Sequence, residues 1–263
     1  MNSAEFLNSV HNMKQPEQVR QAIENCLQCG GLDEDDALYR VGQLYRYGPT
    51  VGCDLAESLN TFMRCAEQGS RLGEYMVGHM YFEGEGVEQS YEQAMFWYLK
   101  AGEKGLRYAQ YCVGIMIENG WGTVADNIKA YDWFMLAAEQ GYGTAQYRVA
   151  CHNYFGLSRP IDIEPAIDWF RKSANNGFPD SQYNLACHLL NADEDESNAE
   201  AKEWLLKAAE NGHKESIYNL TICAFFGIGM DSDYDYAMKW LNVLSAEDQG
   251  KLMKFLDESV VEV

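Results

Sequence analysis

The sequence predicts an all-α protein built from stacked helix pairs, and two observations lead to that class. One residue pattern returns at a nearly constant interval, and its clearest markers are tryptophans separated by 36, 36, 35 and 36 residues: Trp97, Trp133, Trp169, Trp204 and Trp240. Within each interval, apolar or small residues recur at i, i+3 and i+4 in two successive segments, which is the spacing of helices. Self-similarity at such a period is typical of a repeat protein.

Further markers keep the same interval and extend the repeat to six units. Tyrosines occupy one equivalent position in all six: Tyr39, Tyr75, Tyr111, Tyr147, Tyr183 and Tyr218. Alanines stand three residues before each tryptophan: Ala94, Ala130, Ala166, Ala201 and Ala237. Glycines close the units at Gly69, Gly105, Gly141, Gly177 and Gly212. Each glycine suits the C-terminus of a helix, because glycine adopts the left-handed conformation without penalty.

The second unit illustrates the predicted helix pair. Its first helix places Tyr75, Gly78 and Tyr81 on one side, and its second places Trp97 and Ala101 on one side. Small residues recur at the position of Gly78, so that helices can approach closely there: Gly42, Gly114, Ala150, Ala186 and Thr221. We expect the tryptophan of the second helix to fill the space beside this small residue. Truncation of Trp133 to Ala would then destabilise the fold by about 3–5 kcal/mol.

Pairs of glycines between the two helices of a unit are interpreted as hinges. They are Gly84/Gly86, Gly120/Gly122 and Gly227/Gly229. A nucleotide-binding loop would follow a strand and carry a third glycine in register, and none of the pairs meets either condition.

The sequence of the third unit resembles a known family. The stretches at residues 109–124 (AQYCVGIMIENGWGTV) and 129–141 (KAYDWFMLAAEQG) resemble the Sel1-like repeats, which are relatives of the tetratricopeptide repeats. The resemblance covers about residues 31–246. It implies a right-handed α-solenoid of helix pairs, with a concave face lined by the first helices, and adaptor-like binding of proteins.

The predicted organisation has three parts. Residues 1–30 form a capping region with an amphipathic helix over 16–30, and residues 247–263 form a final helix and tail. A capping box at Ser245–Asp248 precedes that final helix. The six repeats occupy about 31–69, 70–105, 106–141, 142–177, 178–212 and 213–246. The fifth unit is one residue shorter and has an acidic turn over 191–198, so we expect its turn to be altered.

Composition limits the possible partners. The formal net charge of −20 disfavours nucleic acid and anionic membranes, and it favours a partner with a basic surface whose binding weakens with salt. The start of the chain shows no secretory signal and no apolar run is long enough to cross a bilayer, so we expect a cytoplasmic protein with reduced cysteines. We expect the free chain to be a monomer.

The sequence carries no common catalytic signature, and we expect no enzyme activity, cofactor or metal. Asp231–Asp235 imitates the start of a calcium loop, but Tyr236 stands where that loop needs glycine. Cys26 and Cys29 have no second pair to complete a zinc site. The pairs Cys151–His152 and Cys187–His188 recur only because the repeat does, and adjacent helices separate them by about 8–10 Å.

A helical wheel of the first helix in each unit predicts a partner-binding face. Tyrosine, phenylalanine and arginine are the residue types that make interface hot spots. The alternative is that the tyrosines only pack between neighbouring helices. The predicted residues are Tyr39, Arg40, Arg46, Tyr75, His79, Phe82, Tyr108, Tyr111, Glu118, Tyr147, Arg148, Tyr154, Phe155, Tyr183, Asn184, Asn219, Phe225 and Phe226.

Two functions of different class follow from the resemblance. The first is a scaffold or adaptor that grips a protein in its groove, with an immunity protein that neutralises a basic bacterial toxin as the sharper version. The second is a hydrolase of the β-lactamase-like type. Those relatives carry a cysteine pair that bridges the two helices of each unit, whereas the cysteines of this chain stand singly at Cys112, Cys151, Cys187 and Cys223. The departure favours the scaffold.

Overall fold

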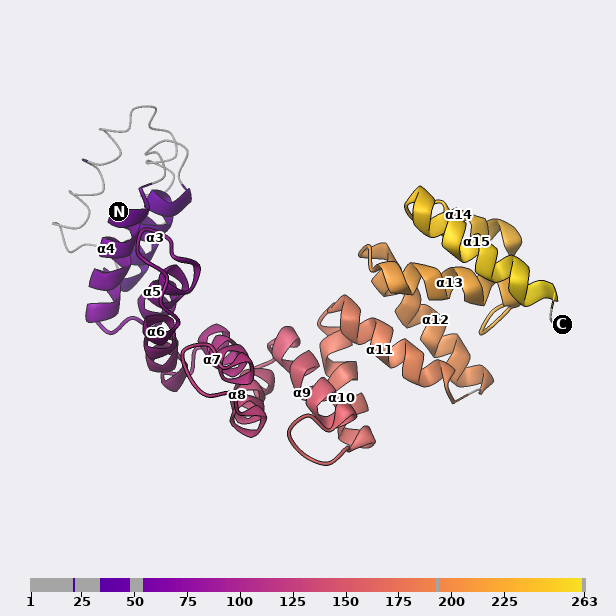
Figure 1. Cartoon of the computed structure of the whole chain (residues 1–263), viewed down its shortest axis with the longest axis horizontal. Helices are drawn as coiled ribbons and strands as arrows, with labels where there is room; N and C mark the ends of the chain where they lie inside the picture. The colour runs from indigo at the N-terminus through magenta and orange to yellow at the C-terminus, as the bar shows by residue number, and fades with distance from the viewer. Residues whose placement is uncertain (1–20, 22–33, 48–53, 193, 262–263) are drawn as a thin grey trace. The chain divides into compact units, whose positions relative to one another are not determined.

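The structure is a computed structural model that describes residues 21, 34–47, 54–192 and 194–261 (Figure 1). Throughout these ranges every regular element is an α-helix, which confirms the predicted all-α class. The predicted N-terminal capping helix lies outside the described residues, except for Gln21.

The chain divides into two compact units, Met1–Gln140 and Gly141–Val263, and each is described by itself. In both units the helices form consecutive antiparallel pairs, and we call the members of a pair helix A and helix B. The pairs of the first unit are α3 (Glu34–Tyr47) with α4 (Leu55–Glu67), α5 (Arg71–Glu83) with α6 (Tyr91–Glu103), and α7 (Arg107–Asn119) with α8 (Asn127–Glu139). Those of the second unit are α9 (Gly143–Phe155) with α10 (Ile163–Asn175), α11 (Pro179–Leu190) with α12 (Asp195–Glu210), and α13 (Lys214–Phe226) with α14 (Tyr234–Leu241), followed by α15 (Ala246–Val261).

Each helix B packs on its own helix A and on the helix A that follows, within the units. The small residue of helix A does allow the close approach that the sequence predicts. An added Cβ at Gly114 would lie 2.5 Å from Phe134, and one at Gly78 would lie 2.8 Å from Tyr98. The residue that fills this space is therefore the one after the tryptophan, and the expectation for the tryptophan itself is wrong.

Burial shows the same division of roles. Phe134 is fully buried, whereas Trp133 is half-buried and lies against Gly102 of the preceding helix B. On a helix, neighbouring residues point about 100° apart, so only one of the two can face the core fully. Truncation of Trp133 is thus expected to destabilise the fold by less than the full core value.

The glycine pairs act as hinges, as predicted. Gly84 ends α5 in the left-handed conformation with φ +74°. The second glycine, Gly86, lies so close to the start of the preceding helix B that a Cβ would be 2.4 Å from the Leu55 carbonyl oxygen. The acidic turn that imitates a calcium loop instead starts a helix, because the Asp233 side chain accepts a hydrogen bond from the Tyr236 amide at 2.9 Å.

In three successive repeats a polar pair joins the buried N-terminal part of helix A to the end of helix B of the same repeat. The pairs are Lys104–Glu74 (2.8 Å), Gln140–Gln110 (2.7 Å) and Asn176–Gln146 (2.8 Å). The residue 30 positions later donates in each case. In the shortened fifth repeat this register is lost, and Gln182 is left with a buried Oε1 that has no hydrogen-bond partner.

The fifth turn is altered, as the sequence predicts. α11 ends at Asn191 in a right-handed conformation instead of at a left-handed glycine, and α12 already begins at Asp195. At the end of the second unit, Ser245 caps α15 by accepting a hydrogen bond from the Asp248 amide at 3.2 Å. Leu252 and Leu256 of α15 are buried in the core of this unit.

Candidate functional site

The repeat tyrosines of the predicted face are half-buried, and their rings belong to the packing of the repeat. Four of the rings lie against the core aromatic residue of their own helix B, with centroid distances of 5.6–6.0 Å for Tyr39–Phe62, Tyr75–Tyr98, Tyr111–Phe134 and Tyr147–Phe170. Tyr183 instead lies 5.0 Å from His213. The tyrosine rings therefore contribute to the packing between helices, as the alternative interpretation expects.

The tyrosine hydroxyls join one helix A to the next. Tyr75 hydrogen-bonds to Cys112, and Tyr147 hydrogen-bonds to Asn184. Tyr183 continues the series to Asn219, whose amide nitrogen also donates to the Cys187 sulfur at 3.6 Å. Burial raises the pKa of Tyr183 to about 12, so the hydroxyl is neutral at pH 7.

The predicted basic residues differ in burial and in pairing within the chain. Arg46 is buried and pairs with Glu85 at 2.5 Å, so its guanidinium is engaged within the first unit. The hydrogen bond from Arg46 lowers the pKa of Glu85. The side chain of Arg40 lies outside the described residues, and Arg148 is half-buried on α9.

In the first unit an aromatic cluster forms at the ends of the A helices. Phe82 lies 5.4 Å from Tyr91 and 5.5 Å from Trp121, measured between ring centroids, and the two partners stack on each other. His79 meets Tyr75 edge-on, Tyr108 lies below Arg107, and Glu118 is half-buried. Sequence reasoning missed Trp121 because it stands in the turn and outside the repeat register.

In the second unit pairs of aromatic residues end the A helices, and the outer member of each pair is exposed. Phe155 is 57% exposed beside Tyr154, and Phe226 is 39% exposed beside Phe225. Tyr154 in turn packs on Phe170. The inner residues thus support rings that face solvent.

Two hollows open along one stripe of α13, which we call the α13 stripe and which consists of Glu215, Tyr218, Asn219 and Ile222. The first, the α15 hollow, has a volume of about 410 Å³ and is lined by Tyr183, Lys214, Glu215, Tyr218, Asn219, Asp248 and Lys251. α15 forms its wall, because Lys214 pairs with Asp248 at 2.9 Å and the Tyr218 hydroxyl donates to the Asp248 carbonyl at 3.2 Å. The hydrogen bond from Lys214 lowers the pKa of Asp248 to about 2.

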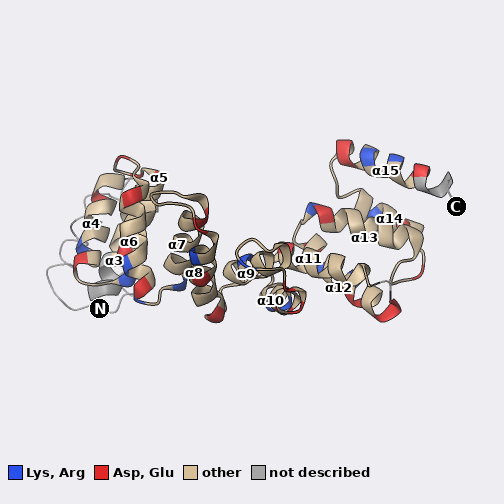
Figure 2. Cartoon of the chain, turned by 60° about the horizontal axis from the view of Figure 1, so that its bottom comes forward, with Lys and Arg blue, Asp and Glu red and all other residues tan. Residues whose placement is uncertain are grey.

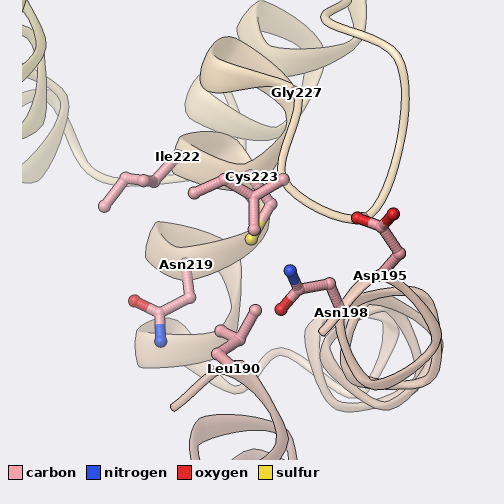
Figure 3. Close-up of a pocket in the computed structure, with 9 residues that line it drawn as sticks. Leu190, Asp195, Asn198, Asn219, Ile222, Cys223 and Gly227 are labelled. Carbon is pink, nitrogen blue, oxygen red and sulfur yellow. The ribbon is translucent and has the colours of Figure 1, made fainter. Parts of the chain in front are cut away.

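The second, the α12 hollow, also has a volume of about 410 Å³ (Figure 3). It is lined by Leu190, Asp195, Asn198, Asn219, Ile222, Cys223, Gly227, Ile228 and Gly229. Asn219 lines both hollows, so the two lie at opposite ends of the same stripe. Of the predicted residues, the structure brings together Tyr183 and Asn219 in the α15 hollow.

Burial keeps two thiols and one imidazole of the described residues neutral at pH 7. Burial raises the pKa of Cys112 to about 12, and burial together with Cys187 raises that of Cys223 to about 11. Burial lowers the pKa of His152 to about 4, so its ring is neutral at pH 7. Across the described ranges, no three His, Cys, Asp or Glu side chains gather closely enough to hold a metal ion. Nor does any helix there have the length and apolar character needed to span a bilayer.

The family follows from the repeat match. The Sel1 repeat model matches six segments: 35–55, 72–106, 107–142, 143–178, 179–213 and 214–243. The chain belongs to the Sel1 repeat family. Sel1 repeats form an α-solenoid scaffold suited to protein–protein interaction.

Solved structures agree with this fold. The crystal structure of a Sel1 repeat protein from Oxalobacter formigenes is 25% identical, with a TM-score of 0.71 over 83% of this chain and 86% of that chain. An immunity protein from Pseudomonas aeruginosa is 17% identical, with a TM-score of 0.52 over 86% and 84% of the two chains, and at that identity it shows the fold alone. A search of curated proteins gave no match.

Proposed function

We propose that this Sel1 repeat protein is a non-catalytic scaffold that binds a partner protein along the A helices, with the α13 stripe as its principal contact. The observation that carries the proposal is the pair of hollows that share Asn219. Concave sites with apolar walls and a few convergent polar groups are where partners place anchoring side chains. The exposed Phe226 at the end of α13 extends this surface.

Charge supports a partner with a basic surface. The formal net charge is −20, and Figure 2 shows acidic residues at the start of α12. One of them, Asp195, lines the α12 hollow. A field of one sign speeds the encounter with an oppositely charged partner and is screened beyond about 8–10 Å at physiological salt. Binding is therefore expected to weaken as salt rises.

A narrower form of the proposal is that the partner is a toxin and that the chain confers immunity to it. The acidic charge supports this form, since it suits a basic toxin domain. Co-expression with a toxin-like protein encoded beside its gene tests it: growth that is restored by the wild-type chain supports immunity, and growth that stays arrested contradicts it.

The hydrolase alternative has weaker support in the described residues. Burial raises the pKa of Cys112 and of Cys223, whereas a nucleophilic cysteine needs a lowered pKa. Turnover of nitrocefin, abolished by substitution of one of these cysteines, would favour that alternative over the scaffold.

The scaffold is tested by affinity purification from the source cells with two matched variants. Asn219→Arg places a long side chain between the two hollows, and Asn211→Arg makes the same change at an exposed turn that lines neither. A partner recovered with the wild-type chain and Asn211→Arg, and lost with Asn219→Arg, supports the proposal. Equal recovery with both variants, each folded by circular dichroism, contradicts it.

A further inference from the structure

The α12 hollow contains an acceptor without a donor. The Oδ1 atom of Asn198 is buried and has no hydrogen-bond partner, and Figure 3 shows the amide directed into the hollow. Most buried polar atoms in folded proteins are hydrogen-bonded, so an orphan of this kind calls for an explanation. A ligand that supplies the missing donor is the simplest one.

The backbone of Asn198 is held in place by two contacts. Its backbone amide donates to the Glu194 carbonyl at 2.8 Å as part of α12. Its own carbonyl lies against Gly229, where an added Cβ would approach to 2.3 Å. The glycine turn therefore fixes the backbone that forms one wall of the hollow.

The charge of the hollow is negative. Asp195 lines it, and Glu194 and Glu196 flank Asp195 at the exposed start of α12. The N-terminus of a helix contributes about half a positive charge, which three carboxylates exceed. Cys223 is a neutral thiol, and among the described residues no lysine or arginine lines the hollow. A ligand group that donates hydrogen bonds and carries positive charge fits these surroundings.

The rest of the lining is apolar, with Leu190, Ile222 and Ile228 around the polar end. Such a wall suits a planar, weakly hydrated cation on an aliphatic stem better than a compact ammonium group, which holds its water more strongly. We propose that the α12 hollow is a pocket for the guanidinium of an arginine on the partner protein, which donates to Asn198 and pairs with Asp195. This inference rests on the proposed function, because it names the anchor of the same partner.

The test uses the full chain and the probe N-acetyl-L-arginine amide, followed by NMR of the Asn198 side-chain amide and the Gly227 and Gly229 backbone amides. The matched control probe is N-acetyl-L-citrulline amide, which has nearly the same shape without the charge. We expect saturable shifts for the arginine probe in the millimolar range and at least fivefold weaker binding of the citrulline probe. No saturable shift, or equal binding of the two probes, overturns the inference.

Variants locate the binding. Asn198→Leu removes the orphan acceptor and is expected to abolish the shifts at Gly227 and Gly229, while Asp195→Asn weakens binding about three- to tenfold. Asp168→Asn makes the same charge change on the exposed surface of α10 and is expected to leave binding unchanged. Retained binding in Asn198→Leu, with the fold intact by circular dichroism, contradicts the assignment.

The two proposals can fail separately. If the arginine probe does not bind but Asn219→Arg still loses the recovered partner, only the guanidinium pocket is wrong. If the probe binds as expected but Asn219→Arg recovers the partner normally, the hollow binds a guanidinium but does not anchor that partner, and the α13 stripe is not the partner's contact.

Discussion

Substitution of Gly114 by alanine tests the packing rule of the repeat. The new methyl group would lie 2.5 Å from Cε1 and 2.6 Å from Cδ1 of Phe134. That ring is fully buried and also packs on Tyr111 of α7, the helix that carries Gly114, at a centroid distance of 5.8 Å. It has little room to shift, so we expect overpacking near the upper end of the usual range, about 3 kcal/mol.

Helix propensity opposes this effect, since alanine is favoured over glycine inside a helix by about 1 kcal/mol. The net expectation is a loss of about 2 kcal/mol in the free energy of unfolding. With a urea m-value of about 2 kcal/mol per molar, the midpoint falls by about 1 M. Gly250 of α15 offers a matched control, because a Cβ added there would meet nothing within 4 Å and Gly250→Ala should only gain the propensity.

The assay is urea denaturation followed by circular dichroism, with each unit's transition fitted by itself if the two separate. The double variant Gly114→Ala with Phe134→Leu is expected to lose less than the sum of the single variants, because the shorter side chain makes room for the methyl group. Gly114→Ala as stabilising as Gly250→Ala, or strict additivity in the double variant, would refute the packing rule.

Three further predictions concern buried polar groups. Iodoacetamide at pH 8 is expected to leave Cys112 and Cys223 unmodified in the folded chain and to label them in urea, because pKa values of about 12 and about 11 keep the buried thiols protonated. Peptide mass spectrometry that finds either cysteine alkylated without urea contradicts this prediction. Glu85→Gln is expected to destabilise the first unit by about 2 kcal/mol, since it leaves the buried Arg46 without its charged acceptor. The pKa of Glu85 is lowered in the fold, so this stabilisation is present above the unfolded pKa and is lost as pH falls through the folded pKa. A difference in free energy of unfolding between the wild type and Glu85→Gln that acid leaves unchanged would show that the ion pair contributes nothing. Tyr147→Phe removes the hydrogen bond between the Tyr147 hydroxyl and Asn184 and is expected to lower the free energy of unfolding by about 1 kcal/mol without loss of the partner. Loss of the partner in a stable Tyr147→Phe chain would instead indicate that the tyrosine contacts the partner.

Periodicity made the fold predictable from the sequence. The interval between tryptophans and the i, i+3 and i+4 spacing depend on local helix geometry, and they located the helix pairs, the hinge glycines and the altered fifth turn. They could not decide which of two neighbouring aromatic residues faces the core. Trp133 and Phe134 differ by one helical step, and only the position of the next helix shows that Phe134 meets Gly114.

The candidate site was predictable only in part. Tyr183 and Asn219 were found because they occupy repeat positions of helix A, and both line hollows in the structure. Asp195 and Asn198 were missed because the sequence assigns residues 191–198 to an acidic turn, whereas the structure places both residues in the first turn of α12. The pairing of Arg46 with Glu85, 39 residues apart, depends on how one repeat stacks on the next, and no local pattern reports it.

Hydrogen exchange on the purified complex tests the central claim most directly. If the partner lies along the A helices, binding is expected to slow exchange in peptides from α11 and α13, which carry Tyr183 and the α13 stripe, and to leave α14 unchanged. Protection confined to the B helices, with α13 exchanging at its free rate, would contradict the claim.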